Sequence, residues 1–130
     1  MARILIVDDE PLIAMMTAEW VEDLGHTPVG PARTLAEALE LLGAGDIDNA
    51  ILDVSLGKEK SYPLADALVA SRIPFAFATG ALFDIEPGDA VAVLAKPFAL
   101  KQFEEAIEAI VPNRVIADMP ALATATASCP

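Results

Sequence analysis

The stretch that decides the fold runs from residue 4 and reads Ile4-Leu5-Ile6-Val7, followed at once by Asp8-Asp9-Glu10. Consecutive apolar residues that stop abruptly at charged ones are typical of a strand covered on both faces, as in a parallel sheet. A second stretch has the same design, because Ala50-Ile51-Leu52 ends in Asp53. Where these strands are neighbours, their carboxylates gather. Gathered carboxylates repel one another unless a proton or a divalent cation neutralises them, and oxygen ligands suit Mg²⁺.

Two later strand ends carry other polar groups. Thr79 follows the apolar run of residues 75–78, and Lys96 follows the apolar run of residues 91–95. In an open parallel sheet, ligands bind outside the carboxyl ends of the strands. Carboxylates, a hydroxyl and a lysine at those ends are the parts of a phosphoryl-transfer centre.

Composition limits the classes of protein to consider. The chain has 130 residues, of which 55% are hydrophobic and 22% charged, so we expect one folded globular domain. The net charge of −12 repels a phosphate backbone, which argues against nucleic-acid binding. No apolar run approaches the roughly 20 residues of a membrane span, and no signal peptide is indicated, so we expect a soluble cytoplasmic protein.

Apolar runs alternate with helical patterns along the chain, which predicts a parallel sheet with helices on both faces. The predicted strands are 3–8, 27–30, 49–53, 74–79 and 91–95. The first helix is expected to pack through its large apolar residues, which are Ile13, Met16, Trp20 and Leu24, and the second through Leu35, Leu39 and Leu42.

Two segments do not fit this alternation. The fourth crossover contains Pro87-Gly88 and leaves too few residues for an ordinary helix, so we expect a loop or a single turn there. After Pro112 the composition turns to Ala, Thr, Ser and Pro, which predicts a domain over residues 1–112 and a flexible tail over 113–130.

Each polar residue of the strand ends has an expected role. Asp9, Asp53 and the backbone carbonyl of Ser55 are expected to ligate Mg²⁺, with Asp8 supporting the site. Asp53, alone on its strand end, is the expected nucleophile and phosphoacceptor. The ammonium of Lys96 pairs with this carboxylate before transfer and with the phosphoryl oxygens after it, and the Thr79 hydroxyl donates a hydrogen bond to a phosphoryl oxygen.

A structural explanation exists for each residue taken alone. The helix dipole favours acidic residues such as Asp9 and Glu10 in a first turn, and a Thr-Gly step such as Thr79-Gly80 is common in turns. Lys58 and Lys60, in the loop after Asp53, are read as solvated. The combination of these residues in this order favours a functional site.

Over residues 2 to about 112 the chain resembles the receiver domain of bacterial two-component response regulators. The resemblance rests on the acidic pair Asp8-Asp9, on Asp53, on Thr79 and on Lys96-Pro97, and the segment 74–80 is similar to the stand-alone "FATGUY" type. It implies a doubly wound, flavodoxin-like α/β fold with strand order 2-1-3-4-5. The short or absent fourth helix is expected from the residues of the fourth crossover and departs from the family pattern. The resemblance also implies Mg²⁺-dependent phosphotransfer to Asp53 from a histidine kinase or phosphotransfer protein, followed by slow hydrolysis.

The resemblance has two further departures. Val93 stands where receivers place an aromatic residue, three positions before the lysine, and Ala81-Leu82-Phe83 follow Thr79-Gly80 where the FATGUY pattern has a tyrosine. The expectation is a signalling phosphoacceptor in a phosphorelay, monomeric or weakly dimeric, that modifies itself slowly, is no classical enzyme and signals to a downstream protein by contact.

Two other functions remain open. A small Mg²⁺-dependent phosphatase would also use an aspartate nucleophile, but its nucleophile would end the first strand in an Asp-x-Asp pattern, which Asp8-Asp9-Glu10 lacks. A receiver that no longer cycles and acts by docking alone is the second.

Overall fold

The computed structural model of the chain describes residues 2–80 and 88–111. In chain order the elements are β1 (Arg3–Val7), α1 (Pro11–Asp23), β2 (Thr27–Ala32), α2 (Leu35–Gly43), β3 (Asn49–Asp53), β4 (Ser55–Leu56), β5 (Glu59–Lys60), α3 (Tyr62–Ala70), β6 (Phe75–Thr79), β7 (Ala92–Ala95) and α4 (Leu100–Ile110). The predicted strands are therefore present at nearly the predicted positions.

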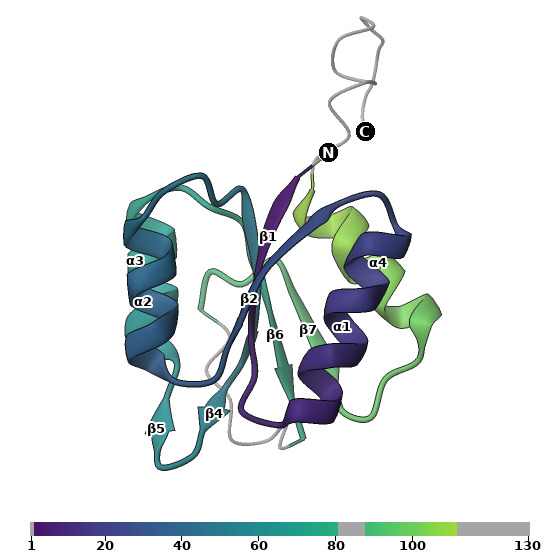
Figure 1. Ribbon diagram of the computed structural model, residues 1–130, viewed down its shortest axis with the longest axis horizontal. Helices are drawn as coiled ribbons and strands as arrows, with labels where there is room; N and C mark the ends of the chain where they lie inside the picture. Colours follow the sequence, from purple (N-terminus) through teal and green to yellow (C-terminus); the bar gives the residue numbers. More distant parts are fainter. Residues whose placement is uncertain (1, 81–87, 112–130) are drawn as a thin grey trace, which may run out of the picture.

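Five of the strands form one parallel sheet in the order β2-β1-β3-β6-β7. Counted along the chain these are strands 2-1-3-4-5, so the predicted doubly wound order is confirmed. Figure 1 shows α2 and α3 on one face of the sheet and α1 and α4 on the other. The short strands β4 and β5 form a separate antiparallel hairpin directly after β3.

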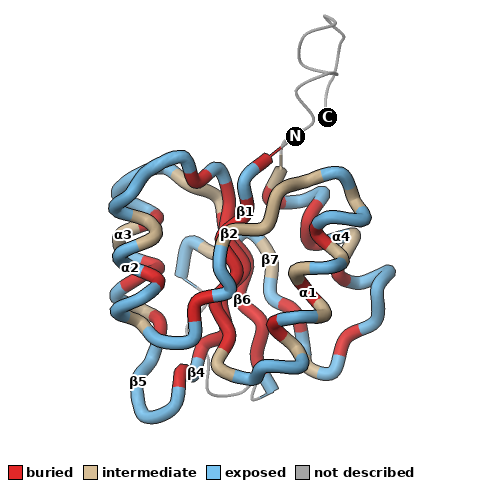
Figure 2. The backbone as a smooth tube through the Cα atoms, viewed as in Figure 1, coloured by how far each residue is buried: buried red, intermediate tan, exposed pale blue. Residues whose placement is uncertain are grey.

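The strands are apolar throughout because successive side chains enter two different cores. On β1, Leu5 and Val7 belong to the core under α2 and α3, whereas Ile4 and Ile6 belong to the core under α1 and α4. Burial concentrates on the central strands, and the outer sides of the helices are exposed (Figure 2). This coverage of both faces explains why apolar and polar residues do not alternate in the sequence of β1.

The packing of α1 and α2 differs in part from the prediction. The fully buried positions of α1 are the small or branched residues Ala14, Thr17 and Val21, and on α2 it is Ala38. Of the predicted residues, Trp20 lies at the border of the core against Phe98 and Phe103, whereas the Leu39 side chain is 39% exposed. Small residues lie against the sheet because they allow the helix backbone to approach it closely.

Two expectations lie outside the described residues. Most of the fourth crossover falls on residues 81–87, and the predicted flexible tail falls on residues 113–130. Among the residues that are described, no helix combines the length and the apolar character needed to cross a bilayer.

Candidate functional site

The predicted site residues lie together at the carboxyl edge of the sheet. Asp8 directly follows β1, Asp53 ends β3, and Thr79 ends β6, and all three are buried, with 4 to 7% of their surface exposed. Asp53 is in register with Ala78, next to Thr79, which places the two polar strand ends side by side. The site is therefore built by the register of the parallel strands.

Lys96 lies at the same edge because it directly follows β7, the outermost strand on one side of the sheet. Its backbone N–H donates to the Thr79 carbonyl at 2.8 Å, which extends the β6–β7 pairing by one residue. Its side chain then reaches back over the sheet and contacts three carboxylates. The Nζ atom lies 3.0 Å from Asp8 Oδ2, 2.8 Å from Glu10 Oε1 and 3.1 Å from Asp53 Oδ2.

The carboxylates of Asp8, Glu10 and Asp53 converge closely enough to share a cation. One oxygen of each lies within 4.8 Å of the others. When all four groups are ionised, three carboxylates and the single ammonium of Lys96 leave two excess negative charges. One divalent cation would neutralise them. Hard oxygen donors with one open, exposed side suit Mg²⁺, so the donor set fits the metal that the sequence predicted.

Glu10 is the residue that the sequence interpretation left out of the site. Taken alone, Glu10 fits the start of a helix as Asp9 does, and it occupies the N-cap position of α1, but its side chain makes no capping hydrogen bond and pairs with Lys96 instead. Its N–H donates to Asp8 Oδ1 at 2.9 Å, which holds the turn between β1 and α1. The sequence signal was Pro11, which starts the helix directly after Glu10 and keeps that glutamate at the strand end.

The two remaining predicted ligands lie close by and make hydrogen bonds of their own. Asp9 is outside the converging carboxylate group, and its Oδ2 accepts a hydrogen bond from the Gly57 N–H at 2.8 Å. Ser55 lies next to the phosphoacceptor candidate, because its N–H donates to Asp53 Oδ1 at 3.2 Å. The roles of Asp9 and of the Ser55 carbonyl as metal ligands stay predictions.

Burial and charge act in opposite directions on the two central groups. Burial raises the pKa of Asp53 to about 6, although the hydrogen bond and charge of Lys96 act to lower it and the charge of Asp8 raises it further. Burial lowers the pKa of Lys96, but hydrogen bonds to Glu10, Asp8 and Asp53 outweigh this, so its net pKa lies above the ordinary value. Lys96 is therefore charged whenever Asp53 titrates.

The raised pKa of Asp53 gives a pH-dependence prediction. Because the folded pKa of about 6 exceeds the ordinary 3.8, folding takes up a proton between these values. The stability that Asp53 contributes is thus present below its ordinary pKa and is lost as the pH rises through about 6. We expect the carboxyl ¹³C signal of Asp53 to titrate near pH 6 without metal and at lower pH with Mg²⁺, which favours the carboxylate. A midpoint near the ordinary value in metal-free protein would contradict this.

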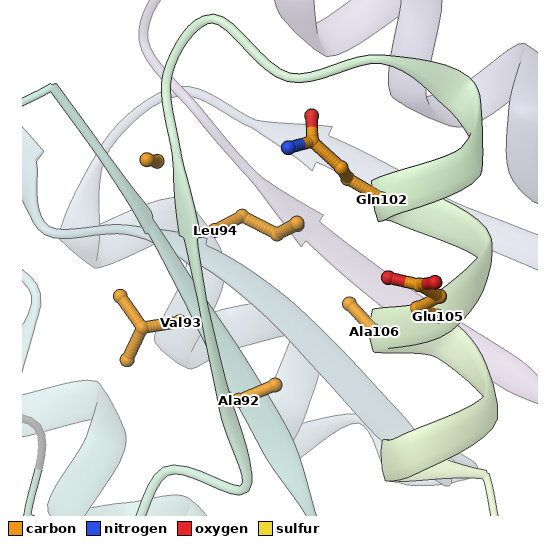
Figure 3. Close-up of a pocket in the computed structure, with 7 residues that line it drawn as sticks. Ala92, Val93, Leu94, Gln102, Glu105 and Ala106 are labelled. Carbon is orange, nitrogen blue, oxygen red and sulfur yellow. The ribbon is translucent and has the colours of Figure 1, made fainter.

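A separate hollow lies between β7 and α4 (Figure 3) and has a volume of about 350 Å³. It is lined by Ala92, Val93, Leu94, Ala95, Gln102, Glu105 and Ala106. Val93, singled out in the sequence as a departure from the resemblance, lies here on the strand and is 38% exposed. None of the converging carboxylates lines this hollow, so it is distinct from the acidic site.

Comparison with known families agrees with the fold. Residues 4–108 match the family model described as the response regulator receiver domain. The chain therefore belongs to the response regulator receiver domain family, and the resemblance inferred from the sequence is confirmed.

Two curated proteins are similar to the chain over most of its length. The phyllosphere-induced regulator PhyR of Methylorubrum extorquens is 36% identical over 102 residues, which is 74% of this chain and 38% of PhyR. The transcriptional regulatory protein PdtaR of Mycobacterium tuberculosis is 33% identical over 112 residues, covering 82% of this chain and 55% of PdtaR. The chain thus spans about half or less of these curated relatives.

A solved structure shows a similar domain. The solution structure of SdrG from Sphingomonas melonis Fr1 is 48% identical to the chain and has a TM-score of 0.76. The match covers 85% of this chain and 96% of the SdrG chain.

Proposed function

We propose that the chain is a phosphoacceptor in a Mg²⁺-dependent phosphorelay, in which Asp53 receives a phosphoryl group from a histidine kinase or a phosphotransfer protein. The observation that carries this proposal is the contact of one ammonium, Lys96, with Asp8, Glu10 and Asp53 at the carboxyl edge of the sheet. A charged lysine held on a buried aspartate is suited to receive phosphoryl oxygens when that aspartate is modified.

Solved relatives support the same chemistry. SdrG has also been solved in a BeF₃-activated conformation, and that structure is 50% identical to this chain with a TM-score of 0.70. Beryllofluoride imitates a phosphoryl group on a carboxylate. These observations concern SdrG, and their extension to Asp53 is part of the proposal.

In the proposed transfer, an oxygen of the Asp53 carboxylate attacks the donor phosphorus. The new oxygen–phosphorus bond forms as the bond between phosphorus and the donor breaks, and the leaving group keeps that electron pair. The product is an acyl phosphate. Mg²⁺, when bound, neutralises charge on the transferring phosphoryl group.

The residues of the chain prepare this step. Asp8 and Glu10 would hold the cation together with Asp53, and Asp9 and the Ser55 carbonyl are the further predicted ligands. Lys96 keeps Asp53 oriented before transfer, because its Nζ donates a hydrogen bond to Asp53 Oδ2 at 3.1 Å. Thr79, buried at the end of β6 beside the strand of Asp53, would donate a hydrogen bond from its hydroxyl to a phosphoryl oxygen.

The output of the proposed phosphoacceptor is contact with a downstream protein. The negative charge of the chain does not favour direct binding to nucleic acid. We further propose that phosphorylation and hydrolysis proceed slowly without a partner enzyme and that the protein acts in the cytoplasm, monomeric or weakly dimeric.

Incubation with a small phosphodonor tests the proposal. With Mg²⁺ and acetyl phosphate, we expect intact-mass spectrometry to show the addition of one phosphoryl group, stable in acid and labile in base as an acyl phosphate is. Chelation of Mg²⁺ should suppress the addition, because the carboxylates around Asp53 otherwise repel the donor. A product that resists base, or sustained release of phosphate well above one equivalent, would contradict a phosphoacceptor and favour the phosphatase alternative.

A further inference from the structure

The hairpin formed by β4 and β5 begins directly after the phosphoacceptor candidate. Each of its strands has two residues, Ser55 pairs with Lys60, and Leu56 pairs with Glu59. A two-stranded hairpin is marginally stable by itself, so its position depends on contacts with the rest of the domain. Part of the anchoring is apolar, since the Leu56 side chain is buried in the core under α2 and α3.

The polar contacts of the hairpin lead to the acidic edge. At its tip, the Gly57 N–H donates to Asp9 Oδ2 at 2.8 Å and so joins segments that are 48 residues apart in sequence. At its base, the Ser55 N–H donates to Asp53 Oδ1 at 3.2 Å. Figure 1 shows the hairpin projecting at the edge of the sheet where β6 ends. Two backbone amides of the hairpin thus orient the carboxylate of Asp53 and that of the predicted ligand Asp9.

We propose that the β4–β5 hairpin is an outer support of the cation site: it positions Asp9 for Mg²⁺, and Mg²⁺ in turn orders the hairpin. A carboxylate has two oxygens, so one can accept the Gly57 amide while the other ligates a cation. Hydrogen bonds of this kind fix the orientation of metal ligands. Because coupling between two binding events is reciprocal, whatever loosens the hairpin must weaken Mg²⁺ binding. This inference rests on the proposed function, since it assumes that the site takes Mg²⁺.

A substitution at Gly57 perturbs the hairpin without replacing any carboxylate residue. Its φ of +67° lies in the left-handed region, and a Cβ there would meet nothing within 4 Å. Gly57→Ala therefore strains the turn through the backbone alone. Gly45→Ala is the matched control, because Gly45 has a φ of +89° with equally open surroundings and lies between α2 and β3, at the opposite edge of the sheet.

We expect calorimetric titration with MgCl₂ to show a dissociation constant for Gly57→Ala raised roughly tenfold, the lower end of the range for outer partners of a metal ligand. The Gly45→Ala protein should bind Mg²⁺ like the wild type, although thermal unfolding shows a similar loss of stability in both variants.

Hydrogen exchange of the unmodified protein provides a second measurement. The Gly57 N–H, bonded to Asp9, should exchange more slowly when Mg²⁺ is added, because the cation and the hairpin stabilise each other. The Gly45 N–H, which donates to the Leu42 carbonyl at 3.1 Å, should be unaffected.

The outcomes separate this inference from the proposed function. If Asp53 is labelled and the wild type binds Mg²⁺, but Gly57→Ala binds it as well as Gly45→Ala and Gly57 exchange ignores the cation, the hairpin coupling is wrong and the proposed function stands. If the wild type neither binds Mg²⁺ nor takes up a phosphoryl group, both are wrong.

Discussion

Asp53→Asn is expected to abolish phosphoryl uptake from acetyl phosphate completely. The amide oxygen of asparagine is a poor nucleophile, and among the buried carboxylates of the described residues the only other one is Asp8, which lies next to Glu10 and Lys96. The fold should survive, because the amide fills the same space and can still accept from the Ser55 N–H. Intact-mass spectrometry after incubation with Mg²⁺ and the donor measures the result.

Asp66→Asn provides the matched control for that substitution. Asp66 is an exposed aspartate on α3, outside the acidic site, so its replacement removes the same charge from the chain without touching the strand ends. We expect it to be labelled like the wild type. Full labelling of the Asp53→Asn protein would refute Asp53 as the phosphoacceptor, and peptide mapping would then locate the true one.

Lys96→Met is expected to destabilise the metal-free protein strongly and to make its stability depend on Mg²⁺. Only 11% of the Lys96 side chain is exposed, and its removal leaves three neighbouring carboxylates without their ammonium. Breaking a buried ion pair costs about 3 kcal/mol or more, and for this open-sided site we expect about 2 kcal/mol at neutral pH. Methionine keeps most of the side-chain volume, so the loss of stability reflects the missing positive charge and not a cavity.

Mg²⁺ should restore much of that stability, because a divalent cation bound to the folded state replaces the missing positive charge. Thermal unfolding with and without MgCl₂ measures the effect, with Lys101→Met, an exposed lysine on α4, as the control. The Lys96→Met protein should bind the cation yet show no conformational response to phosphorylation, since the ammonium proposed to bind the phosphoryl oxygens is gone. Equal stability of the two variants in metal-free buffer would show that the three ion pairs of Lys96 contribute nothing to folding.

Much of the site follows from the sequence, because strand ends in a parallel sheet share one edge. Asp8, Asp53, Thr79 and Lys96 each terminate an apolar run, and the register of neighbouring strands then brings them together. The double coverage of the sheet is equally visible, since strands buried on both faces must be apolar throughout. For these residues, the regular geometry of parallel strands converts a position at the end of an apolar run into a position at one edge of the sheet.

The tertiary structure decided the features that depend on irregular backbone. The turn between β1 and α1 directs Glu10 toward Lys96 and Asp9 toward Gly57. From the sequence, Asp9 is expected to be a metal ligand, which stays a prediction, and Glu10 has no assigned role in the site. The segment with Lys58 and Lys60 was read as a solvated loop, and it contains a hairpin bonded to the acidic edge. Two adjacent acids have the same chemistry, so only the φ and ψ angles of the turn determine which one reaches the lysine.

The tertiary structure also determined which residues of α1 are buried. Large apolar residues predicted the general side of the helix, but Ala14, Thr17 and Val21 are the residues buried against the sheet. A helix that approaches a sheet closely has no room for a large side chain at the point of contact, and the distance between the two layers is set by every residue that packs between them. The sequence therefore predicted where the strands lie and which polar residues end them, and the packed structure determined where each carboxylate points.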